Sequence, residues 1–121
     1  MGAPVTMYHA SESVWTSKGK ASPKFAVVNA SSAGANTIVA AVAGKQILVQ
    51  LYLDVAATAV NVSWESSGGD ILDGPVPCGA TGGVMGNFSP VGHFITAVGE
   101  GLVLYLSDAV QVGGHVQYIL I

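Results

Sequence analysis

The stretch KQILVQLYLD, residues Lys45–Asp54, decides the fold class because its apolar side chains recur at every second position. Such an alternation divides the side chains between the two faces of a strand. One face carries Ile47, Val49, Leu51 and Leu53, and the other carries Gln46, Leu48, Gln50, Tyr52 and Asp54. A period of two is typical of a half-buried β-strand, so the pattern predicts a strand whose leucine face lies in a core.

The same period recurs from Phe25 to the end of the chain. The other runs are KFAVVNA, NTIVAAV, TAVNVSWES, GHFITAV, GLVLYLS and GHVQYILI. Glycine-rich turn signals separate them, and those at Gly99–Gly101 and Gly113–Gly114 predict tight hairpins. We therefore expect an all-β protein: an antiparallel β-sandwich or jelly roll with an extended N-terminal arm. An immunoglobulin-type sandwich is the alternative, although its Cys–Trp–Cys signature is absent.

The first 24 residues differ from the rest because they have neither strand nor helix periodicity. We expect an arm over residues 1–24 and the sandwich domain over residues 25–121. Apolar side chains such as Met7, Tyr8 and Trp15 are unusual in a disordered tail, so the arm is expected to order against a surface. The alternative is a frayed terminus folded loosely over the domain.

Charge is sparse and unevenly distributed. Only 9% of the 121 residues are charged, arginine is absent, 50% are hydrophobic, and the mean hydropathy is +0.55. Residues 1–25 carry three lysines and one glutamate, whereas the remainder carries one lysine and six acidic residues. Three lysines without arginine or interleaved aromatics make a poor nucleic-acid patch, so no nucleic-acid partner is expected.

The low charge also predicts that part of the surface is buried in an oligomer; a compact β domain with a quiet surface is the plainer alternative. The oligomer-interface candidates are the apolar or aromatic residues assigned to outward faces: Leu48, Tyr52, Val103, Tyr105, Ile119 and Ile121. The last two follow from the final strand, where alternation groups Val116, Tyr118 and Leu120 on the opposite face.

Residues for chemistry are scattered. His9, His93 and His115 lack the short spacing of a metal site, and no GxSxG nucleophile motif occurs. The lone Cys78 excludes an intrachain disulfide and lies in a turn-rich stretch, which favours a semi-buried thiol over a nucleophile. We expect no catalytic residues, no metal, no cofactor and no enzymatic activity. No apolar run reaches membrane-spanning length, so no membrane partner is expected.

Several segments give the chain a family resemblance. They are IVAAVAGKQI, the Gly74–Pro75 pair, SPVGHF, AVGEGLVLYLS and the terminal VGGHVQYILI. Over residues 36–121 the sequence resembles small virion structural proteins of tailed bacteriophages. These segments are turns and strands rather than catalytic signatures, so they indicate a kind of module more than a role.

The resemblance implies a jelly-roll-like domain that forms an oligomer, often a trimer. It implies a capsid cement or decoration protein on the capsid surface of the virion, whose partners are further copies of itself and the major capsid protein. The arm would then supply the capsid contacts, for which the candidates are Met7, Tyr8, Trp15, Lys18, Lys20 and Lys24.

Two other functions stay open at this point. A tail or baseplate structural module, or a receptor (carbohydrate)-binding module, would place Tyr52, Trp64 or Tyr105 in an exposed groove. A small cupin-type enzyme would need a metal cluster that the histidine spacing does not provide.

Overall fold

The computed structural model describes residues 14–16 and 19–121, and these residues form only β-strands and loops. The strands are β1 (Val14–Thr16), β2 (Gly19–Ala21), β3 (Lys24–Ala30), β4 (Gly34–Val39), β5 (Ile47–Ala56), β6 (Val60–Ser66), β7 (Ile71–Cys78), β8 (Gly83–Gly86), β9 (Phe94–Ile95), β10 (Leu102–Leu106) and β11 (Val112–Leu120). The predicted all-β class is therefore confirmed. Within the described ranges, no helix has the length and apolarity needed to cross a membrane.

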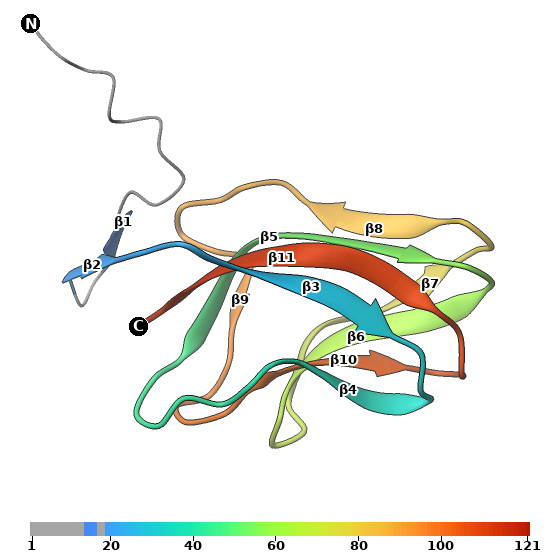
Figure 1. Ribbon diagram of the computed structural model, residues 1–121, viewed down its shortest axis with the longest axis horizontal. Helices are drawn as coiled ribbons and strands as arrows, with labels where there is room; N and C mark the ends of the chain where they lie inside the picture. The colour runs from blue at the N-terminus through green and yellow to red at the C-terminus, as the bar shows by residue number, and fades with distance from the viewer. Residues whose placement is uncertain (1–13, 17–18) are drawn as a thin grey trace, which may run out of the picture.

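Two antiparallel sheets pack face to face as a β-sandwich (Figure 1). The smaller sheet has the order β4-β10-β6-β7, and the larger has the order β3-β11-β5-β8, with β9 also pairing with β5. Because β8 and β9 pair with opposite ends of β5, they act as one interrupted edge strand. If β8 and β9 are counted as one strand, each strand from β3 onward lies in the other sheet from the strand before it, except that β6 and β7 lie in the same sheet. This is the arrangement of a jelly roll.

This topology corrects both predicted glycine hairpins. The segment Gly99–Gly101 connects β9 in the larger sheet to β10 in the smaller one, so it is a crossover. Gly113 and Gly114 lie inside β11 and pair with β3 and β5. A two-residue hairpin requires both strands to be neighbours in one sheet, which β10 and β11 are not.

Gly114 is needed because the backbone of β5 approaches it closely. A Cβ atom at position 114 would lie 1.7 Å from the carbonyl oxygen of Leu53. The neighbouring Gly113 has far more room, since its Cβ would meet only the carbonyl oxygen of Val28, at 3.9 Å. The two adjacent glycines therefore have different roles: only Gly114 permits the close packing of β11 on β5.

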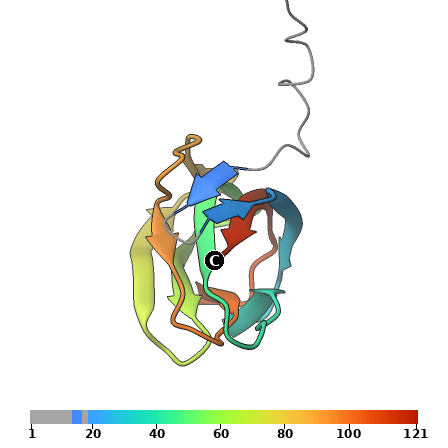
Figure 2. The same ribbon diagram turned by 90° about the vertical axis from the view of Figure 1, so that its left-hand side faces the viewer.

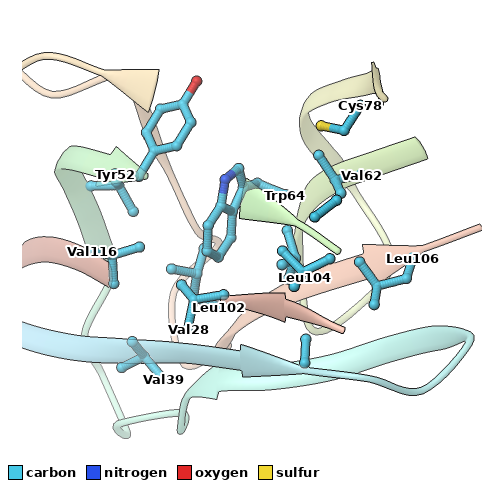
Figure 3. Packing of buried hydrophobic residues seen from close by; sticks show 14 of the residues in the cluster. Val28, Val39, Tyr52, Val62, Trp64, Cys78, Leu102, Leu104, Leu106 and Val116 are labelled. Carbon is cyan, nitrogen blue, oxygen red and sulfur yellow. The ribbon is translucent and has the colours of Figure 1, made fainter. Parts of the chain in front are cut away.

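The core lies between the sheets around Trp64, which is 1% exposed (Figure 3). Its ring centroid is 6.0 Å from those of both Tyr52 and Phe94, with an edge-on arrangement toward Tyr52. Aromatic residues bury large apolar areas, so this trio accounts for much of the packing between the sheets. Around it pack aliphatic residues from both sheets, among them Val28, Val39, Val62, Leu102, Leu104, Leu106, Val112 and Val116.

The final strand β11 occupies the interior of the larger sheet, between β3 and β5. Pairing extends past its end, because the Ile121 amide donates to the Gln46 carbonyl at 3.0 Å and the Gln46 amide donates to the Ile121 carbonyl at 2.9 Å. The apolar terminus is thus a docked strand.

Within the predicted arm, β1 and β2 form a short antiparallel hairpin with Trp15 opposite Lys20. Figures 1 and 2 place this hairpin at the end of the sandwich where the C-terminus lies. The larger sheet begins at Lys24, the last residue assigned to the arm.

Candidate functional site

The outward side of the larger sheet is built from matching positions of four strands. Strand register places Val27, His115, Leu53 and Met85 in one row across β3, β11, β5 and β8. One neighbouring row contains Phe25, Gln117 and Leu51. The other contains Asn29, Gly113, Val55 and Gly83. Paired residues in an antiparallel sheet share a face, so these side chains form one surface, which we call the outer sheet face.

The outer sheet face is apolar and exposed. Val27 is 75% exposed, Met85 63%, Phe25 60% and Val55 42%. Its polar members are Asn29, His115 and Gln117, and none of its residues is an aspartate, glutamate or lysine. The apolar side chains lie on β3 and on β5 with β8, and β11 between them contributes Gly113, His115 and Gln117. A solvent-facing side of an antiparallel sheet normally carries polar residues, so exposed apolar residues on this scale favour a contact surface.

A β-bulge at Gln50 explains why this face is apolar. The register between β5 and β11 shifts between Gln117 and Tyr118, and these two residues pair with Leu51 and Val49. The extra residue, Gln50, reverses the inward and outward sides of β5 after it. Gln50 is fully buried; its side-chain amide donates to the Pro90 carbonyl at 3.4 Å and accepts from Gln117 at 3.4 Å.

The bulge overturns the predicted faces of the strand at Lys45–Asp54. Ile47 and Val49 face the core as predicted, whereas Leu51 and Leu53 pair with Gln117 and His115 on the outward side. A strict period of two cannot anticipate the extra residue, so every position after it was assigned to the wrong side.

The predicted apolar patch of Leu48, Tyr52, Val103 and Tyr105 is not assembled. Tyr52 belongs to the core and is 7% exposed (Figure 3). Val103 and Tyr105 lie on the outward side of the smaller sheet, where Val103 is buried and Tyr105 is 43% exposed. Leu48 belongs to the larger sheet, so these residues lie on different layers.

The two terminal isoleucines are placed differently from each other. Ile119 pairs with Leu48 on the outward side, as alternation predicted, but it is fully buried within the chain. Leu48 itself lies beneath the loop that joins β8 and β9, since a Cβ on Gly92 would be 2.3 Å from a methyl group of Leu48. Ile121 is half-buried. Ile119 therefore has no surface to offer to a neighbouring subunit.

The capsid-contact candidates fall mostly outside the described side chains. Met7, Tyr8 and Lys18 lie outside the described residues. Trp15 and Lys20 lie in β1 and β2, where the strand pairing alone is described. Lys24 is exposed at the start of β3, beside the outer sheet face. Whether these residues contact a capsid stays a prediction.

A second feature is a buried acidic group on the inner side of β5. Asp54 is fully buried, and neither of its carboxyl oxygens has a hydrogen-bond partner among the described residues. Burial raises the pKa of Asp54 to about 7; the indole N–H of Trp64 opposes this rise, and the charge of Asp73 adds to it. The indole N–H itself makes no hydrogen bond of full geometry.

Two neighbours on β7 and one on β5 surround this acid. The Tyr52 hydroxyl donates to the Asp73 carboxylate at 3.1 Å and joins the two sheets. Burial, together with Asp73, raises the pKa of Tyr52 to about 12. Burial also raises the pKa of the Cys78 thiol, with a smaller contribution from Asp54. A buried thiol with a raised pKa is a poor nucleophile, which agrees with the structural role predicted for Cys78.

The described residues contain no group of three or more His, Cys, Asp or Glu side chains arranged to hold a metal ion. His93 packs against the Tyr52 ring with centroids 5.6 Å apart, and one of its ring nitrogens contacts the Asn87 carbonyl. His115 instead occupies the outer sheet face opposite Leu53. His9 lies outside the described residues.

Two of the features above were missed by the sequence interpretation. Phe25 and Val27 alternate with the inward-facing Ala26 and Val28 in KFAVVNA, so the outward position of the larger residues was present in the sequence. Asp54 was assigned to the polar side of its strand, and no local signal distinguishes a buried aspartate from an exposed one.

No protein-family model matches the chain, and comparisons with curated proteins and solved structures found no match.

Proposed function

We propose that the protein is a structural component of a tailed-bacteriophage virion, of the capsid cement or decoration type. Copies associate through the outer sheet face, and the N-terminal arm holds the oligomer on the major capsid protein at the capsid surface. The observation that carries the proposal is the outer sheet face: exposed apolar residues on β3, β5 and β8, with no aspartate, glutamate or lysine among its members.

Three further points support this proposal. The sequence over residues 36–121 resembles small virion structural proteins, for which a trimer is the expected oligomer. Jelly rolls are frequent in viral capsid domains. The Asp54 carboxyl group is fully buried between the sheets, so it does not face an open site.

The mechanism is passive. An oligomer that binds neighbouring capsid subunits in the assembled shell, and not in the dissociated state, adds its binding free energy to the stability of the shell. Closed symmetry repeats each contact, so several weak arm contacts combine into one strong attachment. Lysines in the arm would favour an acidic capsid surface.

The carbohydrate-binding alternative loses most of its support. It required exposed aromatic rings, but Tyr52 and Trp64 are buried in the core and only Tyr105 is exposed. Aromatic platforms bind sugars by stacking against an open ring face, which a buried ring does not provide.

Binding to capsids tests the proposal directly. Expanded, undecorated shells assembled from the major capsid protein encoded in the same genome are mixed with the purified protein and sedimented. We expect saturable binding at micromolar concentrations and loss of binding for a variant without residues 1–23, which keeps β3 intact. Shells that do not saturate, or full binding without the arm, would contradict the proposal. Saturable binding to tails instead would assign the protein to the tail.

A further inference from the structure

Asp54 is the acidic group most enclosed by the fold. It lies on the inner side of β5, between the two sheets, with both carboxyl oxygens unpartnered among the described residues. An ionised carboxylate in such a place loses its hydration with no hydrogen bond of full geometry to compensate, and the indole N–H of Trp64 offsets only part of this cost, which favours the neutral acid. Between about pH 4 and pH 7 the folded protein therefore keeps a proton that the unfolded chain releases.

The surroundings of Asp54 contain few titratable groups. On β7 these are Asp73 and Cys78, and on β5 the nearest is Tyr52. The strand β6 contributes the uncharged indole of Trp64. The residues paired with Asp54 on β8 and β11 are Val84 and Gly114, neither of which titrates. No cation is among these groups, so ionised Asp54 would face a second carboxylate and no counter-ion.

The position of Asp54 in the sandwich indicates which strands would separate when its carboxyl group loses a proton. Strands β7 and β8 each end their sheet and have one neighbour only (Figure 1). The Tyr52–Asp73 hydrogen bond joins the two sheets on this side. Water can therefore reach Asp54 most easily when these two edge strands separate, as a local opening rather than complete unfolding.

We propose that Asp54 binds a proton in the folded protein and that loss of this proton opens the sandwich along β7 and β8. The proton-bound state is closed, and the ionised state exposes the carboxylate to water at that edge. This device depends on the fold alone and not on the proposed capsid function.

Carbon-13 NMR of the wild-type protein labelled at the aspartate carboxyl carbon tests the proton binding. We expect one aspartate with a titration midpoint near pH 7, and the Asp54→Asn variant assigns that signal to Asp54. A midpoint for Asp54 near pH 4, the usual value of an exposed aspartate, would overturn the proposal. This measurement needs no variant to fold if the signal is assigned through the backbone.

Hydrogen–deuterium exchange tests the opening. After correction for the intrinsic exchange rate, we expect protection over residues 71–86 to fall by about tenfold or more between pH 5 and pH 8 and to stay below that of β4 and β10 at every pH. Asp54→Asn should abolish this change. The matched variant Asp73→Asn should keep it at a lower pH, because a neighbouring negative charge is removed. Equal loss of protection in Asp54→Asn, or the same protection for residues 71–86 as for β4 and β10 at pH 8, would overturn the proposal.

Discussion

After its bulge, β5 carries apolar residues on its outward side and a tyrosine and an aspartate on its core side. This is the reverse of an ordinary sandwich strand. Leu51, Leu53 and Val55 face outward, whereas Tyr52 and Asp54 face the core. In an ordinary strand the apolar side is buried and the polar side meets water. The reversal leaves an apolar surface available for contacts and places an ionisable group where ionisation is costly.

The first half of the same strand follows the ordinary rule. Ile47 and Val49 face the core, and the change occurs at Gln50, whose side chain is held by Pro90 and Gln117. A single inserted residue thus separates a purely structural half of β5 from a half with both a contact surface and a proton-binding group. The substitutions below test each side of this comparison.

The largest expected effect concerns pH and the inner side. Burial raises the pKa of Asp54 from 3.8 to about 7. Because the folded state binds a proton that the unfolded state has lost, the contribution of Asp54 to the free energy of unfolding is complete below about pH 4 and is lost as pH rises through 7. The shift corresponds to roughly 4 kcal/mol. Urea denaturation from pH 4 to pH 8 measures it.

Two variants locate the cause of this pH dependence. Asp54→Asn should remove most of the decline between pH 4 and pH 7, whereas Asp108→Asn, at an exposed turn, should leave it unchanged. Glu100 acts in the other direction: hydrogen bonds from Ser66 and Gly68 lower its pKa, so its contribution is lost in acid. An unchanged decline in Asp54→Asn would contradict the assignment to the inner side of β5.

The second prediction concerns the close contact of β11 with the second half of β5. Gly114→Ala is expected to destabilise the protein by on the order of 3 kcal/mol, because its Cβ would overlap the Leu53 carbonyl oxygen, a backbone atom that cannot rotate away. Gly113→Ala should cost much less, since its Cβ has open space around it. Thermal unfolding of both variants measures the difference, and equal melting temperatures would show that the close approach is absent.

A smaller effect is expected for the hydrogen bond between the sheets. Tyr52→Phe removes the donor to Asp73 and keeps the aromatic packing on Trp64, so we expect a loss of about 1 kcal/mol. Tyr105→Phe, at an exposed position on the smaller sheet, should lie within about 0.5 kcal/mol of the wild type. Chemical denaturation at one pH checks both. A loss in Tyr105→Phe as large as in Tyr52→Phe would contradict the role of this bond.

The fold class could be predicted from the sequence because a period of two is repeated in every run. Trp64 and the leucines of β10 then alternate on the inner side as the pattern requires. The glycine hairpins could not be predicted correctly, since Gly113 and Gly114 have the composition of a turn whether they end a strand or lie beside a neighbouring backbone. That distinction depends on β5, which is distant in the sequence.

The sequence predicted an apolar surface on the domain, but it did not predict correctly which residues form that surface. The low charge of the chain indicated a contact surface, and Phe25 and Val27 followed the alternation of β3. Leu51, Leu53 and Tyr52 were assigned to the wrong sides because the bulge at Gln50 is set by pairing with β11. Pairing between distant segments is not encoded in local periodicity.

Sedimentation velocity measures whether copies of the protein associate through the outer sheet face. The wild type is compared with Val27→Lys, at a highly exposed position of that face, and with Tyr105→Lys on the opposite side of the sandwich. We predict an oligomer, with a trimer expected, for the wild type and Tyr105→Lys, and a folded monomer for Val27→Lys. A monomeric wild type, or dissociation by Tyr105→Lys alone, would contradict this prediction.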